Sequence, residues 1–374
     1  MRKAKVMMVV GARPQFIKSA PIIRELVKNH NEITLSIIHS GQHYDREMSY
    51  IFFHDLLIPK PAINLAVGSG SHGAQTATMI ERLERCMLKL RPDIVVVPGD
   101  TNTTLAGAVS AAKLSIPIAH VEAGLRSGDM TMPEEVNRRL TDHCSTLLFA
   151  PTYNAVGNLK KEGLGGKTHL TGDTMVDALR AAMPTVQQRQ STVLRRYVLS
   201  PRKYLLMTLH RPSNVDNPNR LGEIVVAVRR IAQRLKVVFP VHPRTRRKLI
   251  GLGKSNDMTR SGVVMVSPLG YVDNLCLLKN AACLLTDSGG MQKESFLLHV
   301  PCTTLRSSTE WPETLVKKAN QLVCDPKMIS EKVLAVAFDE RLRNKIRDLR
   351  NPFGDGRASI RIVQLIRESV ETQK

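Results

Sequence analysis

The chain has 374 residues, of which 43% are hydrophobic, so it can bury substantial cores and is long enough for two domains. Its net charge of +21 would suit nucleic-acid binding, but aromatic residues make up only 4% and no nucleic-acid-binding motif is present, so we expect no nucleic-acid partner. No apolar segment approaches the ~20 residues that span a bilayer, and no secretory leader or C-x-x-C pair is present. We therefore expect a cytoplasmic protein with no membrane association and no metal site.

Short β-branched runs alternate with helical periods through the first half of the chain. Strand–helix alternation of this kind predicts a parallel sheet that is covered by helices on both faces. The predicted strands are 4–10, 33–39, 94–97, 116–121, 147–149 and 168–170, and the predicted helices are about 15–29, 74–90, 103–113, 134–145 and 154–162.

A stretch near 174–202, rich in Arg and Gln, interrupts this pattern and indicates a boundary between domains 1–175 and 176–356. The alternation then restarts, with strands predicted near 204–208, 236–241, 263–266, 283–286 and 302–305. Both halves begin with a strand that runs into Arg-Pro, at Arg13 and at Arg211. Ligands of open α/β sheets lie beyond the carboxyl ends of the strands, so we predict an α/β protein with two Rossmann-like domains facing one cleft.

Two glycine motifs do not mark nucleotide sites. Residues 68–73 match G-x-G-x-x-G, but they follow a weak run well inside the first domain, which favours a flexible loop. Gly253-Lys254-Ser255 resembles the end of a Walker A motif, but Lys248 stands where its first glycine should be, which excludes a P-loop.

The stretch 284–294 reads as a buried strand, a glycine turn and the start of a helix. Free N–H groups at a helix start, next to Ser288, Gly289 and Gly290, form an anion site that suits a phosphate. Glu294 lies further along the helix, where its carboxylate can accept hydrogen bonds from ribose hydroxyls. The alternative is an ordinary helix that is capped by Asp287 or Ser288.

Acidic residues lie at comparable places in the first half. Asp100 and Glu122 each end a predicted strand, and Glu134 lies in the first turn of a helix after Pro133. Each acid also has a purely structural interpretation. Glu134 can simply stabilise the helix through its dipole, by about 0.3–1 kcal/mol, and Asp100 can be a turn residue or a helix cap. Together, three acids directed at one crevice can hold different pKa values and supply both an acid and a base.

Blocks in the same order along the chain, from Val6 to about Ala358, resemble the non-hydrolysing UDP-N-acetylglucosamine 2-epimerases. The blocks are Gly11-Ala12-Arg13-Pro14, Gly99-Asp100-Thr101, His120-Val121-Glu122-Ala123-Gly124-Leu125-Arg126, Pro133-Glu134-Glu135-x-Asn137-Arg138, Thr208-Leu209-His210-Arg211, His242-Pro243-Arg244, Asp287-Ser288-Gly289-Gly290 and Asn351-Pro352-Phe353-Gly354-Asp355-Gly356.

The resemblance implies a GT-B fold, like that of UDP-glycosyltransferases and glycogen phosphorylase, with a C-terminal helix within 357–374 packing back on the first domain. It implies interconversion of UDP-GlcNAc and UDP-ManNAc by a homodimer. The implied catalytic residues are Asp100, Glu122, Glu134 and His210. The implied contacts to the UDP-sugar are Arg13, Lys18, His210, His242, Arg244, Ser288, Gly289, Gly290 and Glu294.

The bond that changes indicates how such a reaction runs. Inversion at C2 breaks a C–H bond, and no adjacent carbonyl group can hold the resulting negative charge. The sequence shows no convincing dinucleotide or PLP site that could take up this charge, so we expect no cofactor. Loss of UDP from C1 as the C2 proton leaves would place the charge on a pyrophosphate. We therefore expect elimination to 2-acetamidoglucal and UDP, followed by re-addition.

Several positions depart from the common family pattern. These positions are Gln15, Lys293 and Trp311. The segments that contain Gln15 and Trp311 resemble the branch that epimerises UDP-2,3-diacetamido-2,3-dideoxyglucuronate, which is the alternative substrate. Gln42 and His43 of the region linked to activation by UDP-GlcNAc are kept, but a later glutamine is missing, which argues against such activation. A hydrolysing epimerase and a non-enzymatic nucleotide-sugar binder are further alternatives.

Overall fold

A computed structural model describes residues 2–41, 56 and 58–372 of the chain. The chain divides into two compact units, of which unit 1 comprises Met1–Ala181 and Pro352–Lys374 and unit 2 comprises Ala182–Asn351. Each unit contains one parallel sheet. The residues Gln42 and His43, which the sequence links to activation, lie outside the described residues.

Unit 1 has a seven-stranded sheet in the order β3-β2-β1-β4-β5-β6-β7. All six strands predicted for the first half are confirmed, and the unpredicted β3 is a two-residue edge strand. The strands are β1 (Ala4–Val10), β2 (Ile33–His39), β3 (Ile63–Asn64), β4 (Ile94–Pro98), β5 (Ile118–Val121), β6 (Leu147–Ala150) and β7 (Thr168–Leu170).

Unit 2 has a six-stranded sheet in the order β10-β9-β8-β11-β12-β13. The five predicted strands are confirmed, and a short sixth, β13, was not predicted. The strands are β8 (Tyr204–Met207), β9 (Lys236–Pro240), β10 (Val264–Val266), β11 (Cys283–Thr286), β12 (Cys302–Thr304) and β13 (Asn320–Leu322).

Helices connect the strands in both units. Those of unit 1 are α1 (Arg13–Lys28), α3 (His72–Leu90), α4 (Asn102–Lys113), α5 (Pro133–Cys144), α6 (Tyr153–Lys161), the 3₁₀ helix η1 (Gly165–Lys167) and α16 (Ala358–Thr372), and α7 (Thr174–Arg196) runs from unit 1 into unit 2. Those of unit 2 are α8 (Pro212–Val215), α9 (Pro218–Ala232), α10 (Pro243–Gly251), α11 (Lys254–Arg260), α12 (Tyr271–Asn280), α13 (Gly289–Leu297), η2 (Pro312–Lys318), η3 (Pro326–Met328), α14 (Ile329–Ala337) and α15 (Glu340–Arg347).

The prediction of a flexible loop at 68–73 is wrong for its last two residues. His72 and Gly73 are the first residues of α3, because Ser71 caps this helix by accepting a hydrogen bond from the Ala74 N–H at 3.4 Å. A serine before an apolar periodic run is a helix-start signal that outweighs the glycine that follows it. Residues 253–255, which resemble the end of a Walker A motif, form the turn into α11, with Gly253 at φ +65°.

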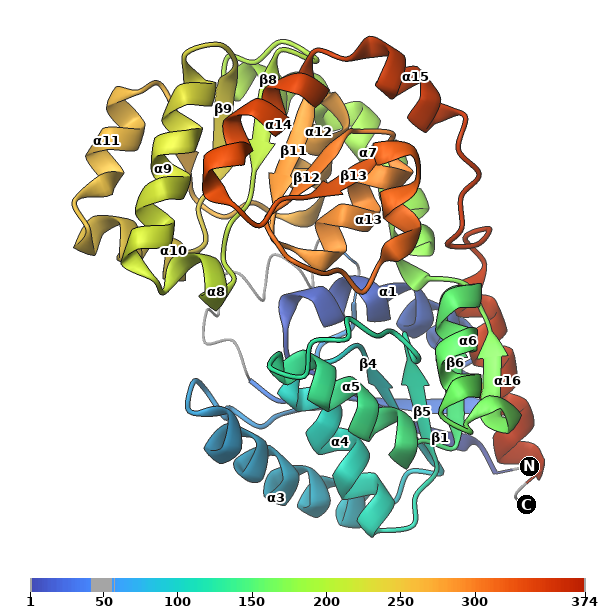
Figure 1. The fold of residues 1–374 in the computed structure, drawn as a ribbon. Helices are drawn as coiled ribbons and strands as arrows, with labels where there is room; N and C mark the ends of the chain where they lie inside the picture. The colour runs from blue at the N-terminus through green and yellow to red at the C-terminus, as the bar shows by residue number, and fades with distance from the viewer. Residues whose placement is uncertain (1, 42–55, 57, 373–374) are drawn as a thin grey trace. The chain divides into compact units, whose positions relative to one another are not determined.

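The core of unit 1 lies between the sheet and the helices α3 and α4. Met7, Val95 and Val97 point from β1 and β4 to the same side, where they pack with Met79 and other apolar residues of those helices. Helices α1 and α16 contact each other and cover the other face of the sheet (Figure 1). Two covered faces explain why β1 and β4 are nearly continuous apolar runs, since neither face is exposed to water.

The C-terminal helix is fixed to the first turn of α7. The Asp177 carboxylate accepts hydrogen bonds from the Ser359 N–H at 2.9 Å and from the Ser359 hydroxyl at 2.6 Å. It also accepts from the Ala358 N–H at 3.2 Å, so one carboxylate satisfies two free N–H groups at the start of α16. This contact places α16 in unit 1, although about 180 residues of chain separate it from Asp177.

The two sheets share the strand order of doubly wound folds. In each sheet the chain adds strands first toward one edge and then toward the other, so the strand order reverses once. The reversal lies between β1 and β4 in unit 1 and between β8 and β11 in unit 2. Loops at the carboxyl ends of these strand pairs form the crevice where such sheets bind ligands. The predicted site residues Arg13 and Asp100 follow the first pair, and His210 and Ser288 follow the second pair.

Candidate functional site

The two loops at the reversal of unit 1 are joined by one buried side chain, Gln15. Its oxygen accepts from the N–H groups of Gly11 at 2.8 Å and Ala12 at 2.9 Å, in the loop after β1. Its amide nitrogen donates to the Pro98 carbonyl and to the Thr104 hydroxyl, both at 3.0 Å, at the other loop. All four hydrogen-bonding positions of the amide are used, so the start of α1 is held against the loop that carries Asp100.

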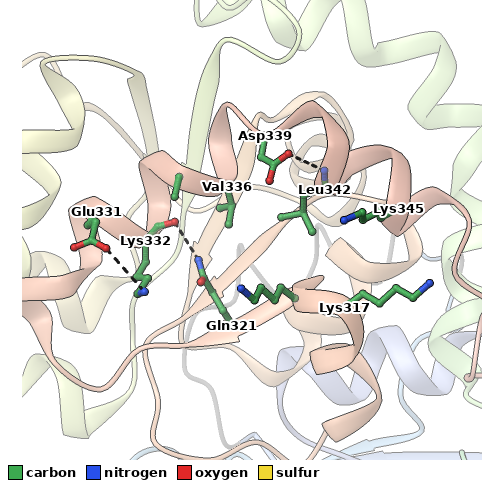
Figure 2. Close-up of a pocket in the computed structure, with 10 residues that line it drawn as sticks. Lys317, Gln321, Glu331, Lys332, Val336, Asp339, Leu342 and Lys345 are labelled. Carbon is green, nitrogen blue, oxygen red and sulfur yellow. Dashed lines mark hydrogen bonds and ion pairs between the residues drawn. The ribbon is translucent and has the colours of Figure 1, made fainter.

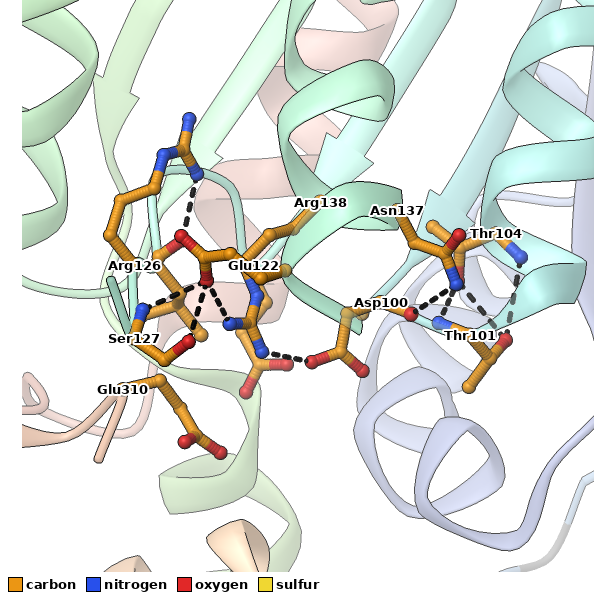
Figure 3. A network of polar contacts seen from close by, with 12 residues as sticks. Asp100, Thr101, Thr104, Glu122, Arg126, Ser127, Asn137, Arg138 and Glu310 are labelled. Atoms are coloured by element: carbon orange, nitrogen blue, oxygen red, sulfur yellow. Dashed lines mark hydrogen bonds and ion pairs between the residues drawn. The ribbon is translucent and has the colours of Figure 1, made fainter. Parts of the chain in front are cut away.

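Asp100 is held from behind by Arg138 of helix α5. The Nη2 atom of Arg138 lies 2.6 Å from the Asp100 Oδ2 atom, and its Nη1 atom lies 2.6 Å from the Glu135 Oε2 atom (Figure 3). The Arg138 side chain is 1% exposed, whereas that of Asp100 is 26% exposed. The buried guanidinium thus fixes a carboxylate that still reaches the surface, and it favours the charged form of that carboxylate.

Glu135 anchors this arrangement from inside the protein. It accepts hydrogen bonds from the Ser127 N–H at 2.8 Å and the Ser127 hydroxyl at 2.9 Å, besides its ion pair with Arg138. Burial alone would raise the pKa of Glu135, but Ser127 and Arg138 outweigh burial and lower it. Glu135 therefore acts as a fixed negative charge beneath Arg138, and it is not placed to exchange protons.

Glu122 follows β5 and adopts an unusual backbone conformation. Its φ is +73°, a left-handed value that costs a residue with a side chain about 1–3 kcal/mol and that clusters at functional sites. The conformation lets the N–H groups of Glu122 and Ala123 both donate to the Phe149 carbonyl at 3.1 Å. The Glu122 carboxylate is nearly buried and forms an ion pair with Lys18 of α1.

The Glu122–Lys18 pair lies next to the loop that carries Asp100. A Cβ atom built on Gly99 would be 3.6 Å from the Lys18 Nζ atom and 3.8 Å from the Glu122 Oε2 atom. Both distances are ordinary van der Waals contacts, so space does not require glycine there, but the φ of +72° is a left-handed value that favours it. The structure therefore brings together three residues predicted from the sequence, namely Asp100, Glu122 and Lys18.

Glu134, the third predicted acid, is half-buried in the first turn of α5. Arg138 lies four residues further along the same helix, so the two side chains share one helix face. Asn137 of this helix donates to the Asp100 carbonyl at 3.0 Å, which fixes the start of α5 beside the Asp100 loop. The remaining predicted residue of unit 1, Arg13, is the first residue of α1.

In unit 2, the buried carboxylate of Asp287 organises the reversal between β8 and β11. It accepts hydrogen bonds from the N–H groups of His210, at 3.0 and 3.1 Å, and Arg211, at 2.8 Å, and from the Asn214 side-chain amide at 3.2 Å. Burial alone would raise the pKa of Asp287, but the facing His210 and these donors outweigh burial and lower the pKa to about 2. Asp287 is thus ionised near neutral pH and binds the loop that carries His210.

The His210 ring is oriented by the same carboxylate. Its Nδ1 atom lies 3.1 Å from the Asp287 Oδ1 atom, while 39% of the side chain is exposed. A carboxylate can only accept, so Nδ1 carries a proton and the Nε2 atom is left for a ligand. The Asp287 contact thus fixes the ring orientation and turns the Nε2 edge of His210 to the surface.

His242 lies beside His210, with ring centroids 5.6 Å apart at 37°. Its Nδ1 atom accepts from the Arg244 N–H at 3.2 Å, which leaves the Nε2 atom as the donor of the neutral ring. The Arg244 guanidinium forms an ion pair with Asp216, which also pairs with Lys248 at 3.3 Å. Any ligand contact of Arg244 must therefore compete with Asp216, a partner that the sequence did not indicate.

The predicted phosphate site is the start of α13, and it contains a carboxylate from another segment of unit 2. Helix α13 begins at Gly289, and the Ser288 hydroxyl makes no capping hydrogen bond. A Cβ atom on Gly289 would lie 2.2 Å from the Glu310 Oε1 atom, so no larger residue fits without displacing Glu310. Glu310 is held by Arg306 at 2.7 Å. Gly290 is in the first turn of α13, and Glu294 is buried further along it.

A hollow of about 710 Å³ lies elsewhere on unit 2, between η2, β13, α14 and α15. Figure 2 shows Lys317, Lys332 and Lys345 along it, together with the apolar side chains of Val336 and Leu342. None of the residues predicted from the sequence to be functional line this hollow, which is formed by Lys317, Lys318, Gln321, Glu331, Lys332, Ala335, Val336, Asp339, Leu342 and Lys345.

Sequence reasoning missed the residues that hold the predicted ones in place. Arg138 and Asp287 stand inside motifs that were recognised, but nothing in their spacing indicates that they support Asp100 and His210. Gln15 and Glu310 lie in segments that depart from the common family pattern, but neither is predicted to support the site. Motif membership is the one signal that pointed to Arg138 and Asp287.

The described part of the chain has neither a cluster of metal-ligating side chains nor a membrane-spanning helix. Among residues 2–41, 56 and 58–372, no group of three or more His, Cys, Asp or Glu side chains could hold a metal ion. No helix among these residues is long and apolar enough to cross a membrane.

The sequence model of the family described as UDP-N-acetylglucosamine 2-epimerase matches residues 25–367. The UDP-N-acetylglucosamine 2-epimerase of Methanocaldococcus jannaschii is 45% identical over 97% of this chain and 98% of its own. The UDP-2,3-diacetamido-2,3-dideoxy-D-glucuronate 2-epimerase of Pseudomonas aeruginosa is 42% identical over 97% of this chain and 99% of its own.

Solved structures agree with these matches. The crystal structure of Methanocaldococcus jannaschii UDP-GlcNAc 2-epimerase in complex with UDP-GlcNAc and UDP has a TM-score of 0.88 and 43% identity, covering 97% of this chain and 99% of that one. Phytolacca americana UGT2, complexed with UDP-2fluoro-glucose and pterostilbene, has a TM-score of 0.60 at 11% identity, over 99% of this chain and all of that one, which shows the fold alone. Together with the two parallel sheets, these likenesses confirm the predicted GT-B fold class. The chain is an epimerase and belongs to the UDP-N-acetylglucosamine 2-epimerase family.

Proposed function

We propose that the protein interconverts UDP-GlcNAc and UDP-ManNAc by eliminating UDP to give 2-acetamidoglucal and then adding UDP back. The observation that carries this proposal is the cluster at the reversal of unit 1, where Asp100 and Glu122 lie beside one loop and form ion pairs with Arg138 and Lys18. Two carboxylates of this kind can serve as an acid and a base for a C2 proton.

The groups of unit 2 suit the other half of the reaction. As the C1–O bond breaks, its electron pair goes to the β-phosphate, so negative charge grows on the leaving UDP. His210, held by Asp287, and the free N–H groups at the start of α13 are donors that favour such charge. Arg13, His242, Arg244 and Glu294 are proposed as further contacts to the UDP-sugar, with Glu294 accepting from the ribose hydroxyls.

Within unit 1, we assign the proton transfers at C2 to two of the acids Asp100, Glu122 and Glu134. Removal of the proton on one face and its return on the other face inverts the carbon. Lys18 holds the Glu122 carboxylate in place through its ion pair, as Arg138 holds that of Asp100. Each transfer contributes typically ~10²–10⁴-fold in rate, so neither acid is dispensable.

The reaction in D₂O tests this scheme. The C2 proton should exchange with solvent, so that substrate and product both gain deuterium at C2 during turnover, as followed by ¹H NMR. Retention of C2 protium through many turnovers would exclude the elimination route. Stoichiometric release of free ManNAc and UDP would instead identify a hydrolysing epimerase.

The alternative substrate is UDP-2,3-diacetamido-2,3-dideoxyglucuronate, which the Pseudomonas aeruginosa relative favours by its identity of 42%. An acidic sugar needs an additional cation, and Lys293 is one departure that could supply it. In the structure, however, Lys293 is buried and its ammonium lies 3.7 Å from the centroid of the Trp311 ring. Lys293 and Trp311, which both depart from the family pattern, thus pack on each other. Because the Lys293 ammonium is engaged inside the protein, it is not placed to bind a sugar carboxylate, which supports UDP-GlcNAc as the first choice of substrate. Incubation with each UDP-sugar and NMR of the C2 configuration decides between them.

We also propose that the enzyme is a cytoplasmic homodimer, as expected from the family resemblance. Light scattering on the purified protein should give twice the chain mass of 41.6 kDa. A mass of one chain at micromolar concentration would contradict the dimer.

Hyperbolic kinetics with UDP-ManNAc alone would support the absence of activation by UDP-GlcNAc.

A further inference from the structure

His120 lies at the centre of the β5 strand, with no exposed surface. Its Nε2 atom lies 2.8 Å from the Gly99 carbonyl oxygen, and its Nδ1 atom lies 2.7 Å from the Asp142 Oδ1 atom. A carbonyl oxygen can only accept, so Nε2 must carry a proton. The contact at Nδ1 also needs a proton, because otherwise two lone pairs would face each other at hydrogen-bonding distance.

The surroundings place this second proton on the ring. The Asp142 carboxylate also accepts from the Gly124 N–H at 3.1 Å and forms an ion pair with Arg126 at 2.7 Å. These donors favour the charged carboxylate, and they and His120 lower the pKa of Asp142 against the opposing effect of burial. His120 is therefore a buried imidazolium with both N–H groups in use.

The other charges near this ring come from three further places. Glu122 lies two residues further along the chain and is paired with Lys18. Asp100 follows Gly99 and is paired with Arg138 of α5. Arg126, in the loop after β5, also pairs at 2.6 Å with Glu162, the residue that directly follows α6. Asp142 is the carboxylate that contacts the ring itself, at 2.7 Å through Oδ1, while its Oδ2 atom faces Arg126, so Asp142 is the counter-ion of His120.

Gly99 links the imidazolium to the proposed acids. Its carbonyl is held by His120, and its α-carbon faces the Glu122 carboxylate and the Lys18 ammonium. The next residue along the chain is Asp100. Loss of the Nε2 hydrogen bond would release the Gly99 peptide and with it the position of Asp100 relative to Glu122.

We propose that His120 is a positioning residue for the epimerisation, and that it holds the Asp100 loop through a permanently protonated imidazole. This inference rests on the proposed roles of Asp100 and Glu122. It gives His120 no contact with the substrate and no proton to exchange during turnover.

The protonation is tested directly by NMR of the intact enzyme with ¹⁵N-labelled histidine. Both His120 nitrogens should show the shift of a protonated ring nitrogen at pH 7–8, with the signal assigned by its loss in His120→Asn. A neutral ring at this pH, with one unprotonated nitrogen, would overturn the inference. This readout does not depend on activity, so it separates the protonation of His120 from the proposed function.

The positioning role is tested by kinetics. His120→Asn should lower kcat on the order of 10²-fold, the scale expected when a reacting group is misplaced by about 1 Å, with little change in KM. His30→Asn is the matched control, because His30 is exposed and its carbonyl, not its ring, accepts from Lys3. Unchanged kcat in a folded His120→Asn protein would overturn the role.

Asp142→Asn provides a conservative variant with a different signature. The side-chain amide that this substitution introduces can donate to a neutral His120 Nδ1 atom while its oxygen still accepts from Gly124, so both ring contacts survive without the second ring proton. Nδ1 should therefore show an unprotonated shift, and kcat should stay well above that of His120→Asn because the Gly99 contact is kept. A kcat as low as that of His120→Asn would contradict the inference. If wild-type His120 is protonated but Asp100→Asn stays active, the proposed function fails and the protonation stands.

Discussion

One ion pair in each loop cluster shows an opposite arrangement of charge. In the Asp100–Arg138 pair of unit 1 the cation is buried, with Arg138 at 1% exposure, and the acid lies nearer the surface, with Asp100 at 26%. In the Asp287–His210 pair of unit 2 the acid is buried, at 0%, and the imidazole is 39% exposed. The same strand order thus presents carboxylates in one unit and donors in the other.

This inversion matches the two halves of the proposed reaction. Proton transfer at carbon needs carboxylates whose charge state is set by fixed neighbours, and Lys18 and Arg138 provide these in unit 1. Stabilisation of a leaving phosphate needs fixed donors, and His210 with the start of α13 provides these in unit 2. A buried counter-ion in each unit pre-organises the exposed group, so the comparison can be tested by removing one partner at a time.

The largest expected effect is that of Asp100→Asn on catalysis. The amide keeps the size of the side chain but cannot act as an acid or a base, so kcat should fall about 10²–10⁴-fold with a small change in KM. Deuterium incorporation at C2 in D₂O should fall in parallel. Glu84→Gln, on the exposed side of α3, is the control and should leave kcat unchanged. An Asp100→Asn enzyme with wild-type kcat would remove Asp100 from the proposed proton transfer.

The next effect is on stability and concerns the buried cation of unit 1. Arg138→Met leaves Glu135, which is fully buried, without its main cation, so unfolding free energy should fall by about 3–5 kcal/mol. Arg139→Met, on the same helix, is the control, because Arg139 is 39% exposed and should cost less than about 1 kcal/mol. Urea unfolding measures both. Equal losses in the two variants would show that burial of Arg138 does not set its contribution.

The buried acid of unit 2 should make stability depend on pH. The pKa of Asp287 is lowered to about 2 in the folded protein, so its contribution is complete above about pH 4 and is lost as pH falls through about 2. The expected loss is about 2 kcal/mol, which Asp287→Asn cannot show because its amide does not titrate. Urea unfolding at several pH values should show the stability gap between the two proteins narrowing from pH 4 to 2. A constant gap would contradict the lowered pKa.

The sequence predicts the fold well where apolar runs are long. β1 and β4 are nearly continuous β-branched or apolar segments, and they appear at the expected positions. The strands β3 and β13 were missed because they are two and three residues long, include polar residues and lie at sheet edges. Such strands are specified by their neighbours and not by their own pattern.

The site could be predicted in its reacting groups but not in their supports. Asp100, Glu122 and His210 each follow a strand, a position that local sequence reveals. Asp287 contacts the His210 loop across 77 residues, and Arg138 contacts Asp100 across 38 residues. Periodicity carries no information on such pairs, because they form only once the strand order is fixed. The buried imidazolium of His120 is hidden for the same reason.

The smallest expected effect concerns the exposed cation of unit 2 and completes the comparison with Arg138. Arg244 and its partner Asp216 are 41% and 36% exposed, so Arg244→Met should change unfolding free energy by less than about 1 kcal/mol, although the ion pair resembles that of Arg138. If Arg244 contacts the UDP-sugar, KM should still rise and its salt dependence should weaken, because one phosphate-facing charge is lost. Lys254→Met, whose exposed pair with Asp257 resembles this one, is the control for both readouts. A stability loss as large as that of Arg138→Met would show that the two units do not differ in where they bury charge.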